Sequence, residues 1–248
     1  MKTIIIMLAI LICLFLGPAL AVATGMARLG GHWSSASRQP SGLAPDPHTT
    51  PEAVVQVYAA RAFSWRGAFG VHTWFAVKPA EASEYTVYEV IGWRAMRGLS
   101  ALAVTNRTPD GFWFGNRPTI LAELRGAAAQ AVIPKLDSAA ATYPYPNQYR
   151  IWPGPNSNTF AAFVAREVPE LRIDLPPTAL GKDFLGPTRL FAPAPSGTGW
   201  QISIYGVFGV LAAVEEGIEI NLLGMTFGID PIDLAVKLPG LGRFAGRG

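Results

Sequence analysis

The chain has 248 residues, of which 50% are hydrophobic and only 15% are charged, and its formal net charge is +3. A chain of this length and hydropathy can bury a substantial core, which excludes a disordered protein or a coiled coil. No block of like charges occurs along the sequence. A nucleic-acid partner is therefore not expected.

The N-terminus carries 25 consecutive uncharged residues between Lys2 and Arg28, enough for a helix across a hydrocarbon core of about 30 Å. Two interpretations stay open. Small residues at 19–23 fit the cleavage site of a signal peptide, whereas the apolar run that continues to Ala27 favours an uncleaved signal anchor over residues 1–27. We predict the anchor, with the rest of the chain on the periplasmic or extracytoplasmic side of a bacterial inner membrane.

Cys13 is the only cysteine and lies inside this apolar run. The rest of the chain therefore has no disulfide, no cysteine-ligated zinc and no thiol chemistry. Ile12 stands before Cys13 where a lipoprotein signal needs a small residue, so lipidation is not expected either. No histidine pair has metal-ligand spacing and no acidic loop fits calcium, so we predict no metal site and no cofactor.

Residues 28–51 are rich in Gly, Pro and Ser and are predicted to be a spacer, followed by a single α+β domain over 52–248. Its expected architecture is an antiparallel sheet with packed helices. Alternating or β-branched runs predict strands at 54–58, 69–77, 85–93, 102–105, 111–114, 149–152, 218–222 and 234–238. One or two helices, interrupted at Gly126 or Pro134, are predicted over 118–141, where Asn116 would cap and Pro118 would begin the first of them. Another helix is predicted over 157–168.

The stretch from Leu190 to Val214 contains 25 residues without a charge, so a second membrane span has to be considered. Its solid apolar part begins only at Ile202 and is interrupted by Gly206 and Gly209. That length is too short for a transmembrane helix. A buried strand is the better interpretation.

The most informative motif is Trp-Pro-Gly-Pro-Asn-Ser-Asn-Thr-Phe over residues 152–160. A turn rich in proline places Asn156, Ser157 and Asn158 where a helix begins, and the free backbone N–H groups there could stabilise an oxyanion beside a nucleophilic Ser157. The alternative is ordinary helix capping, for which each of these three residues is suited. Trp152, at the start of the motif, is a candidate for ligand contact.

A serine nucleophile needs a base, and His72 is the candidate because it lies within a predicted strand beside Trp74. If Val77 pairs with Glu84 across the hairpin loop, Glu89 lies opposite His72 and could orient its imidazole. The sequence therefore indicates a possible Ser157, His72 and Glu89 triad, with Trp74 nearby. The alternative is a histidine that only packs in the sheet, and a register slip of two would remove the Glu89 pairing.

Four strings together resemble the bacterial domain-of-unknown-function 3750 family: Val71–Trp74, Tyr149–Phe160, Leu175–Ala179 and Glu215–Asn221. The resemblance covers nearly all of the chain after the spacer. It implies membrane association and carries no established activity.

A more distant resemblance links the motif around Ser157 to circularly permuted papain-like proteins of the NlpC/P60 and PPPDE groups. In those proteins a strand histidine precedes a cysteine that opens a helix, so the resemblance implies a papain-like scaffold with Ser157 in place of the cysteine and His72 as its histidine. Serine has a far higher pKa than a thiol, so a thiol mechanism does not carry over.

Three functions are compatible with these observations. The favoured one is a membrane-tethered envelope protein that binds an unknown envelope ligand without catalysis. A structural protein whose C-terminal strands pair with a partner is close to it. The alternative is a serine-type hydrolase or acyl transferase acting on envelope amides or esters.

Overall fold

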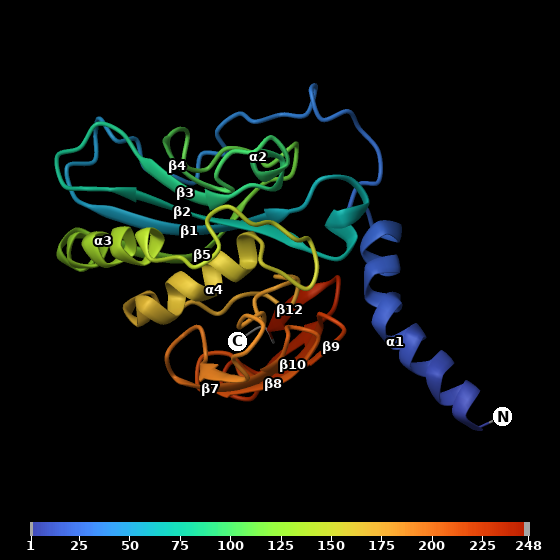
Figure 1. The fold of residues 1–248 in the computed structure, drawn as a ribbon. Helices are drawn as coiled ribbons and strands as arrows, with labels where there is room; N and C mark the ends of the chain where they lie inside the picture. The colour runs from blue at the N-terminus through green and yellow to red at the C-terminus, as the bar shows by residue number, and fades with distance from the viewer. Residues whose placement is uncertain (1, 246–248) are drawn as a thin grey trace.

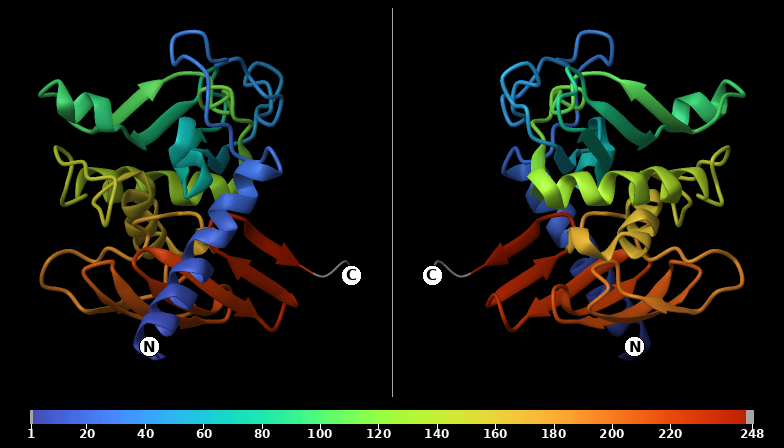
Figure 2. Two further views of the ribbon diagram at one scale, coloured as in Figure 1. Left: turned by 90° about the vertical axis from the view of Figure 1, so that its right-hand side faces the viewer. Right: turned by 90° about the vertical axis from the view of Figure 1, so that its left-hand side faces the viewer.

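The computed structural model describes residues 2–245, without the side chains of residues 3 and 6–9. It is a mixed α and β fold with two antiparallel sheets and few helices. Figures 1 and 2 show the two sheets on either side of a layer with helices α3 (Gly126–Ala141) and α4 (Ser157–Glu167), and helix α1 (Lys2–Ala23) along one side. The expected α+β class with an antiparallel sheet and packed helices is confirmed at this level.

The five-stranded sheet has the order β4-β3-β2-β1-β5. Its strands are β1 (Val54–Arg61), β2 (Val71–Lys78), β3 (Thr86–Val90), β4 (Leu102–Asn106) and β5 (Thr119–Arg125). Strands β1 and β2 are almost entirely buried because both faces of the sheet are covered. This explains their continuous apolar and β-branched sequence, which is typical of strands with two buried faces.

One face of this sheet packs on α3 (Gly126–Ala141) and α4 (Ser157–Glu167), where Phe75 meets Phe160 edge to face. The opposite face is covered by two loops, and the predicted spacer supplies one of them. Leu43 and Ala44 pack there, and Asp110 accepts hydrogen bonds from their backbone N–H groups. Residues 40–44 of the spacer are thus part of the folded body.

The seven-stranded sheet has the order β12-β11-β10-β9-β8-β7-β6. Its strands are β6 (Phe191–Pro193), β7 (Gly199–Ile204), β8 (Phe208–Ala213), β9 (Gly217–Leu222), β10 (Met225–Asp230), β11 (Ala235–Leu238) and β12 (Gly242–Ala245). Its upper face lies against the helical layer: the Arg166 guanidinium of α4 donates to Pro193 O and to Gln201 Oε1.

Helix α1 (Lys2–Ala23) packs on the folded body through its C-terminal half. Ala21 is fully buried against Ala68, close to Leu241 at the C-terminal hairpin. Over the described residues, none of the helices combines the length and hydropathy that a membrane span requires.

Some predicted elements were wrong. The helix expected from Pro118 begins only at Gly126, because 119–125 pairs with the edge of β1. Asn116 is not its cap and instead donates to Arg61 O at the end of β1. Residues 111–114 and 149–152 form no strand, and the third strand ends at Val90, where the short helix α2 (Gly92–Met96) follows.

The predicted buried strand after Ile202 is also wrong. Residues 199–213 form the hairpin β7–β8, and the large apolar side chains of its two strands are exposed except for Leu211, which is buried on the inner face. Ile202 and Val210, which pair across this hairpin, are 56% and 52% exposed. The sequence showed an apolar strand, but the polar side of that strand faces inward.

Candidate functional site

The motif at 152–160 folds into a turn that ends in a capped helix. Asn156 is the N-cap of α4, and its Oδ1 accepts the backbone N–H groups of Asn158 at 2.9 Å and Thr159 at 3.1 Å. The Thr159 hydroxyl accepts the Asn156 N–H in return, which completes a capping box. Of the three candidate residues, Asn156 is the N-cap of α4.

The two predicted binding amides, Asn156 and Asn158, are engaged in hydrogen bonds within the protein. Asn156 Nδ2 donates to Ile151 O and Leu180 O, both at 3.0 Å. Asn158 Nδ2 donates to Leu180 O at 2.8 Å and to Val71 O at 3.1 Å. These amides therefore tie α4 to strand β2 and to the chain near Leu180. They position the site rather than offer free groups to a ligand.

Ser157 lies at the first position of α4, is almost fully buried and lines a cavity. Its hydroxyl makes no hydrogen bond to another described residue. The backbone around it is held by Thr73, whose hydroxyl donates to Ser157 O at 3.1 Å. Among the described contacts of Asn156, Ser157, Asn158 and Thr159, the Ser157 hydroxyl is thus the polar side-chain group without a hydrogen-bond partner.

His72 does not meet Ser157. Thr73 and Phe75 of β2 face α4, and side chains alternate along a strand, so His72 and Trp74 point to the opposite face of the sheet. The predicted pair of nucleophile and base is separated by the sheet itself. The sequence pattern predicts strand β2 but does not tell which of its two faces packs against α4.

His72 and Glu89 do meet: His72 Nε2 lies 3.0 Å from Glu89 Oε2. The predicted register was nevertheless wrong, since Glu89 pairs with Trp74 and His72 reaches it diagonally. Arg107 Nε donates to the other carboxylate oxygen at 2.9 Å. Together the buried His72 and Glu89 and the partly buried Arg107 form a polar cluster on the face away from α4, which we call the charged cluster.

Burial lowers the pKa of His72, and this outweighs the opposing effect of its hydrogen bond with Glu89. For Glu89, burial alone would raise the pKa, but the hydrogen bond with His72 and the charge of Arg107 bring it below its ordinary value. The carboxylate is thus ionised and accepts the Nε2–H of a neutral imidazole. This arrangement satisfies the buried carboxylate.

Aromatic rings enclose the imidazole. The ring of Trp113 stacks on His72 at 3.7 Å between centroids, and Trp74 stacks at 5.6 Å. Trp74 is fully buried, and its Nε1 donates to Pro109 O at 2.7 Å. The structure therefore places Trp74 in the core rather than at a ligand surface.

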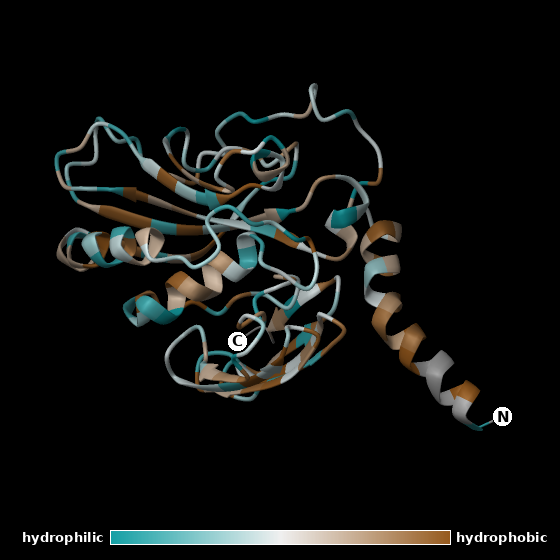
Figure 3. Cartoon of the chain, in the orientation of Figure 1, coloured by the Kyte–Doolittle hydropathy of each residue, from teal (hydrophilic) through white to brown (hydrophobic). Residues whose placement is uncertain are grey.

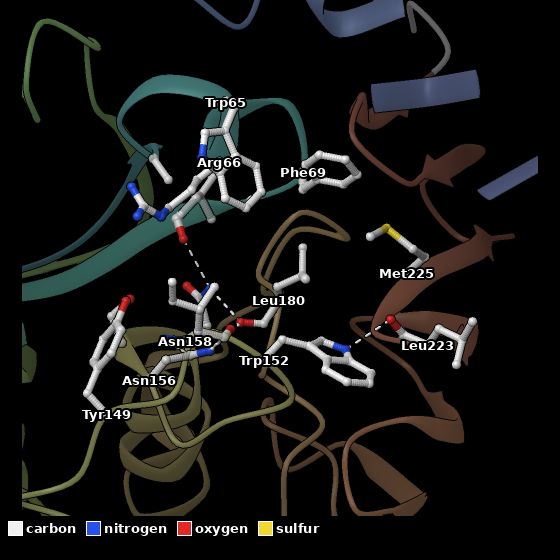
Figure 4. Close-up of a pocket in the computed structure, with 15 residues that line it drawn as sticks. Trp65, Arg66, Phe69, Tyr149, Trp152, Asn156, Asn158, Leu180, Leu223 and Met225 are labelled. Atoms are coloured by element: carbon white, nitrogen blue, oxygen red, sulfur yellow. Dashed lines mark hydrogen bonds between the residues drawn. The ribbon is translucent and has the colours of Figure 1, made fainter. Parts of the chain in front are cut away.

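The cavity at the start of α4 has a volume of about 390 Å³. Figure 4 shows Trp65 and Phe69 on one side and Trp152, Leu223 and Met225 on the other. The indole Nε1 of Trp152 donates to Leu223 O at 3.0 Å and so joins the motif to the β9–β10 turn. The lining residues are Ala62, Trp65, Arg66, Phe69, Gly70, Val71, Tyr149, Ile151, Trp152, Asn156, Ser157, Asn158, Leu180, Leu223 and Met225.

Arg66 and Tyr149 are the titratable groups among the residues that line this cavity. Burial raises the pKa of Tyr149, so its phenol stays protonated at neutral pH. Arg66 is a permanent cation whose guanidinium lies 5.4 Å from the Trp65 ring centre. No general base for Ser157 is present among these lining residues.

The sequence pointed to Trp152 and Ser157 but missed most of the cavity. Trp65 and Arg66 come from the short helix η1 (Ser64–Ala68), and Leu223 and Met225 from the opposite sheet. No spacing in the chain signals that these segments meet. Their meeting depends on the packing of the two sheets.

The profile of a family described as "Protein of unknown function (DUF3750)" matches residues 52–184, which is more than half of the chain. This protein belongs to that family. The matched region of this DUF3750 protein contains the five-stranded sheet, α3, α4 and the charged cluster at His72, and it ends before β6. Searches of curated proteins and of solved structures found no match.

Proposed function

We propose that this DUF3750 protein is a membrane-tethered, extracytoplasmic binding module whose cavity at the start of α4 holds a small amphipathic anion. The observation that carries this proposal is an apolar cavity whose amide groups are already hydrogen-bonded within the protein. A volume of about 390 Å³ is within the usual range of small-ligand sites. The cavity does not support the structural alternative, in which the C-terminal strands pair with a partner.

The apolar walls favour a ligand with an aliphatic or aromatic body. Two indoles, Trp65 and Trp152, stand on opposite sides of the cavity, and Leu180 lies between them (Figure 4). Trp152 is 46% exposed, so a ligand that covered it would remove apolar surface from water. Burial of such surface is the main favourable contribution to binding.

Arg66 supports an anionic end on that ligand. Arg66 is exposed, belongs to the residues that line the cavity and makes no ion pair with another residue in the described range. A carboxylate, sulfonate or phosphate could form a bidentate contact with it. The unknown envelope ligand is therefore expected to be amphipathic.

Catalysis by Ser157 is the second candidate. Its support is an unbonded hydroxyl at a helix N-terminus, where backbone N–H groups favour negative charge. Against it stands His72, which faces the other side of the sheet, and a cavity wall without a base. A papain-like scaffold is the finer fold proposal: the packing of α4 on β2 supports it, and the position of His72 counts against it.

The tether proposed here is helix α1. Large apolar side chains are exposed on this helix between residues 4 and 16: Ile4, Ile5, Ile10, Leu11, Ile12, Phe15 and Leu16. Such a surface is costly in water and favourable in lipid. Lys2 would stay at the cytoplasmic end and the folded body would lie outside the inner membrane.

The test is a fluorescence titration of the full chain with 11-(dansylamino)undecanoic acid. Trp152→Ala should weaken binding about tenfold because it removes a wall of the cavity, and Arg66→Gln should weaken it by less. Trp33→Ala and Arg97→Gln change exposed residues outside the cavity and are the matched controls. Unchanged affinity in both cavity variants would contradict the proposal.

A further inference from the structure

The outer face of the seven-stranded sheet is apolar and exposed. Across the strands, outward positions pair with one another, as in the row Phe191, Ile202, Val210, Ile220 and Phe227. Within this row, Ile220 is 48% exposed. Figure 3 shows apolar residues along these strands, at the end of the molecule opposite β4 and α2.

The inner face of the same sheet is polar and buried. Glu219 and Asn221, which flank Ile220 along β9, are 2% and 4% exposed. Lys237 of β11 is fully buried and donates to Glu219 Oε1 at 2.8 Å. The sheet is thus reversed relative to an ordinary sheet in water, in which the apolar face is covered.

We propose that the outer face of the seven-stranded sheet is a lipid-binding surface that lies against the membrane. A contiguous apolar patch of this kind on a folded domain marks a membrane or protein contact. Strand β8 is paired along its full length with both neighbours, and β9 is paired with β10 from Ile218 to Leu222, so the backbone polar groups at the centre of this face are satisfied without water. Lipid can therefore cover this face without leaving those groups unpaired.

The position of helix α1 favours lipid over a second copy of the chain as the partner that covers the outer face. The turn between β11 and β12 packs on α1, where a Cβ on Gly17 would lie 1.9 Å from Pro239 O. From this contact α1 continues to the side of the molecule on which the outer face lies, as both views in Figure 2 show. A second copy seated on the sheet would leave the apolar side chains of α1 in water, whereas a bilayer covers both surfaces.

The edge of the sheet fits a membrane interface. The rings of Phe191 and Trp200 stack at 4.8 Å between centroids at the β6 edge, and both side chains are exposed. Arg189 lies next to this pair and donates to Phe191 O. Aromatic rings beside cations are the side chains that collect at the headgroup level of a bilayer.

This surface is separate from the cavity, so the inference goes beyond the proposed function and does not depend on a ligand there. It also differs from tethering by α1 alone, which would leave the sheet in water. The experiment must therefore report on the sheet itself rather than on attachment of the chain to vesicles.

The test uses the full chain with Cys13→Ser and a single new cysteine labelled with a nitrobenzoxadiazole fluorophore. One form carries Ile220→Cys on the outer face. The matched control carries Met96→Cys, which is 83% exposed on α2, on the opposite side of the molecule. Each is mixed with vesicles of phosphatidylethanolamine and phosphatidylglycerol, with and without doxyl-labelled lipid.

The proposal expects a blue shift and strong doxyl quenching for the label at position 220 and neither for the label at position 96. Two results would overturn it. If both labels stay in water while the chain is bound to vesicles, α1 alone holds the membrane. If the label at 220 is shielded without vesicles, with a dependence on protein concentration, the face is an interface between copies of the chain.

Discussion

The two sheets of this protein differ in which of their faces are covered. In the five-stranded sheet both faces are covered, and strand β1 is buried at seven successive positions from Val54 to Ala60. In the seven-stranded sheet only the polar face is covered, and strand β9 alternates between buried Glu219 and exposed Ile220. A two-residue period in hydropathy therefore predicts a strand but does not tell which of its faces points inward.

The reversed sheet is possible because its buried polar groups bind one another. Glu219 accepts hydrogen bonds from Lys182 and Lys237, and Lys237 also donates to Asp174. Burial alone would raise the pKa of Glu219, but the two lysines bring it below its ordinary value. Asp174 is less well compensated, and burial raises its pKa to about 6. A network with each charge paired can persist in the interior, although it contributes little net stability.

The largest expected difference between the sheets is in core packing. Phe75→Ala in β2 should lower the free energy of unfolding by about 4 kcal/mol, because Phe75 is fully buried against Phe160. Phe208→Ala in β8 removes a side chain that is 45% exposed and should cost less than about 1 kcal/mol in the absence of lipid. Chemical denaturation of both variants measures this contrast, and equal losses would contradict it.

A second pair compares the two faces of one strand. Lys237→Met should destabilise by about 3 kcal/mol because it leaves Glu219 and Asp174 with fewer partners in the interior. Val236→Ser, one residue away, changes the exposed face and should change stability by less than about 0.5 kcal/mol. If the serine variant were the less stable of the two, the sheet would be oriented the other way.

Loss of the α4 cap should lower the free energy of unfolding by somewhat less than loss of Lys237. Asn156→Ala removes two bonds to helix N–H groups and two to carbonyl oxygens, so a loss of about 2 kcal/mol is expected. Asn147→Ala, at an exposed asparagine of the preceding turn, is the control. Thermal or urea unfolding would show similar stabilities if Asn156 were a ligand group rather than a cap.

The smallest effect concerns pH and the charged cluster of the five-stranded sheet. Below its ordinary pKa of 6.5, His72 binds a proton in the unfolded chain but stays neutral in the fold, because burial lowers its pKa. Stability contributed by this group should therefore be present at pH 7 and fall as the pH drops below 6.5. His72→Gln should flatten this part of the stability profile. If the stability of the wild type and of His72→Gln changed in the same way between pH 7 and pH 5, His72 would not titrate as described.

Much of the fold followed from local patterns. The strands at Val54 and Val71 and the helix at Ser157 were predictable because their apolar runs and the Asn156 cap are local features. Residues 119–125 were not, because pairing with β1 overrides their helical pattern. For the site, the capping residues and Trp152 could be found from one motif, whereas Arg66 and Met225 come from segments that meet only in the folded chain.

The contact between His72 and Glu89 shows the same limit. Two side chains on one face of neighbouring strands were expected to meet, and they do, through a diagonal contact that the expected register did not give. The position of α4 on the other face depends on how the helices cover the sheet. Alternation within β2 carries no information about that choice.

We propose that the cavity beside Ser157 binds a ligand without catalysis. The most direct test treats the wild-type chain and Ser157→Ala in parallel with a fluorophosphonate probe and titrates both with 11-(dansylamino)undecanoic acid. The structure predicts no labelling of either protein and equal affinity for the fatty acid. Labelling of the wild type that Ser157→Ala abolishes would contradict the claim and make Ser157 a nucleophile.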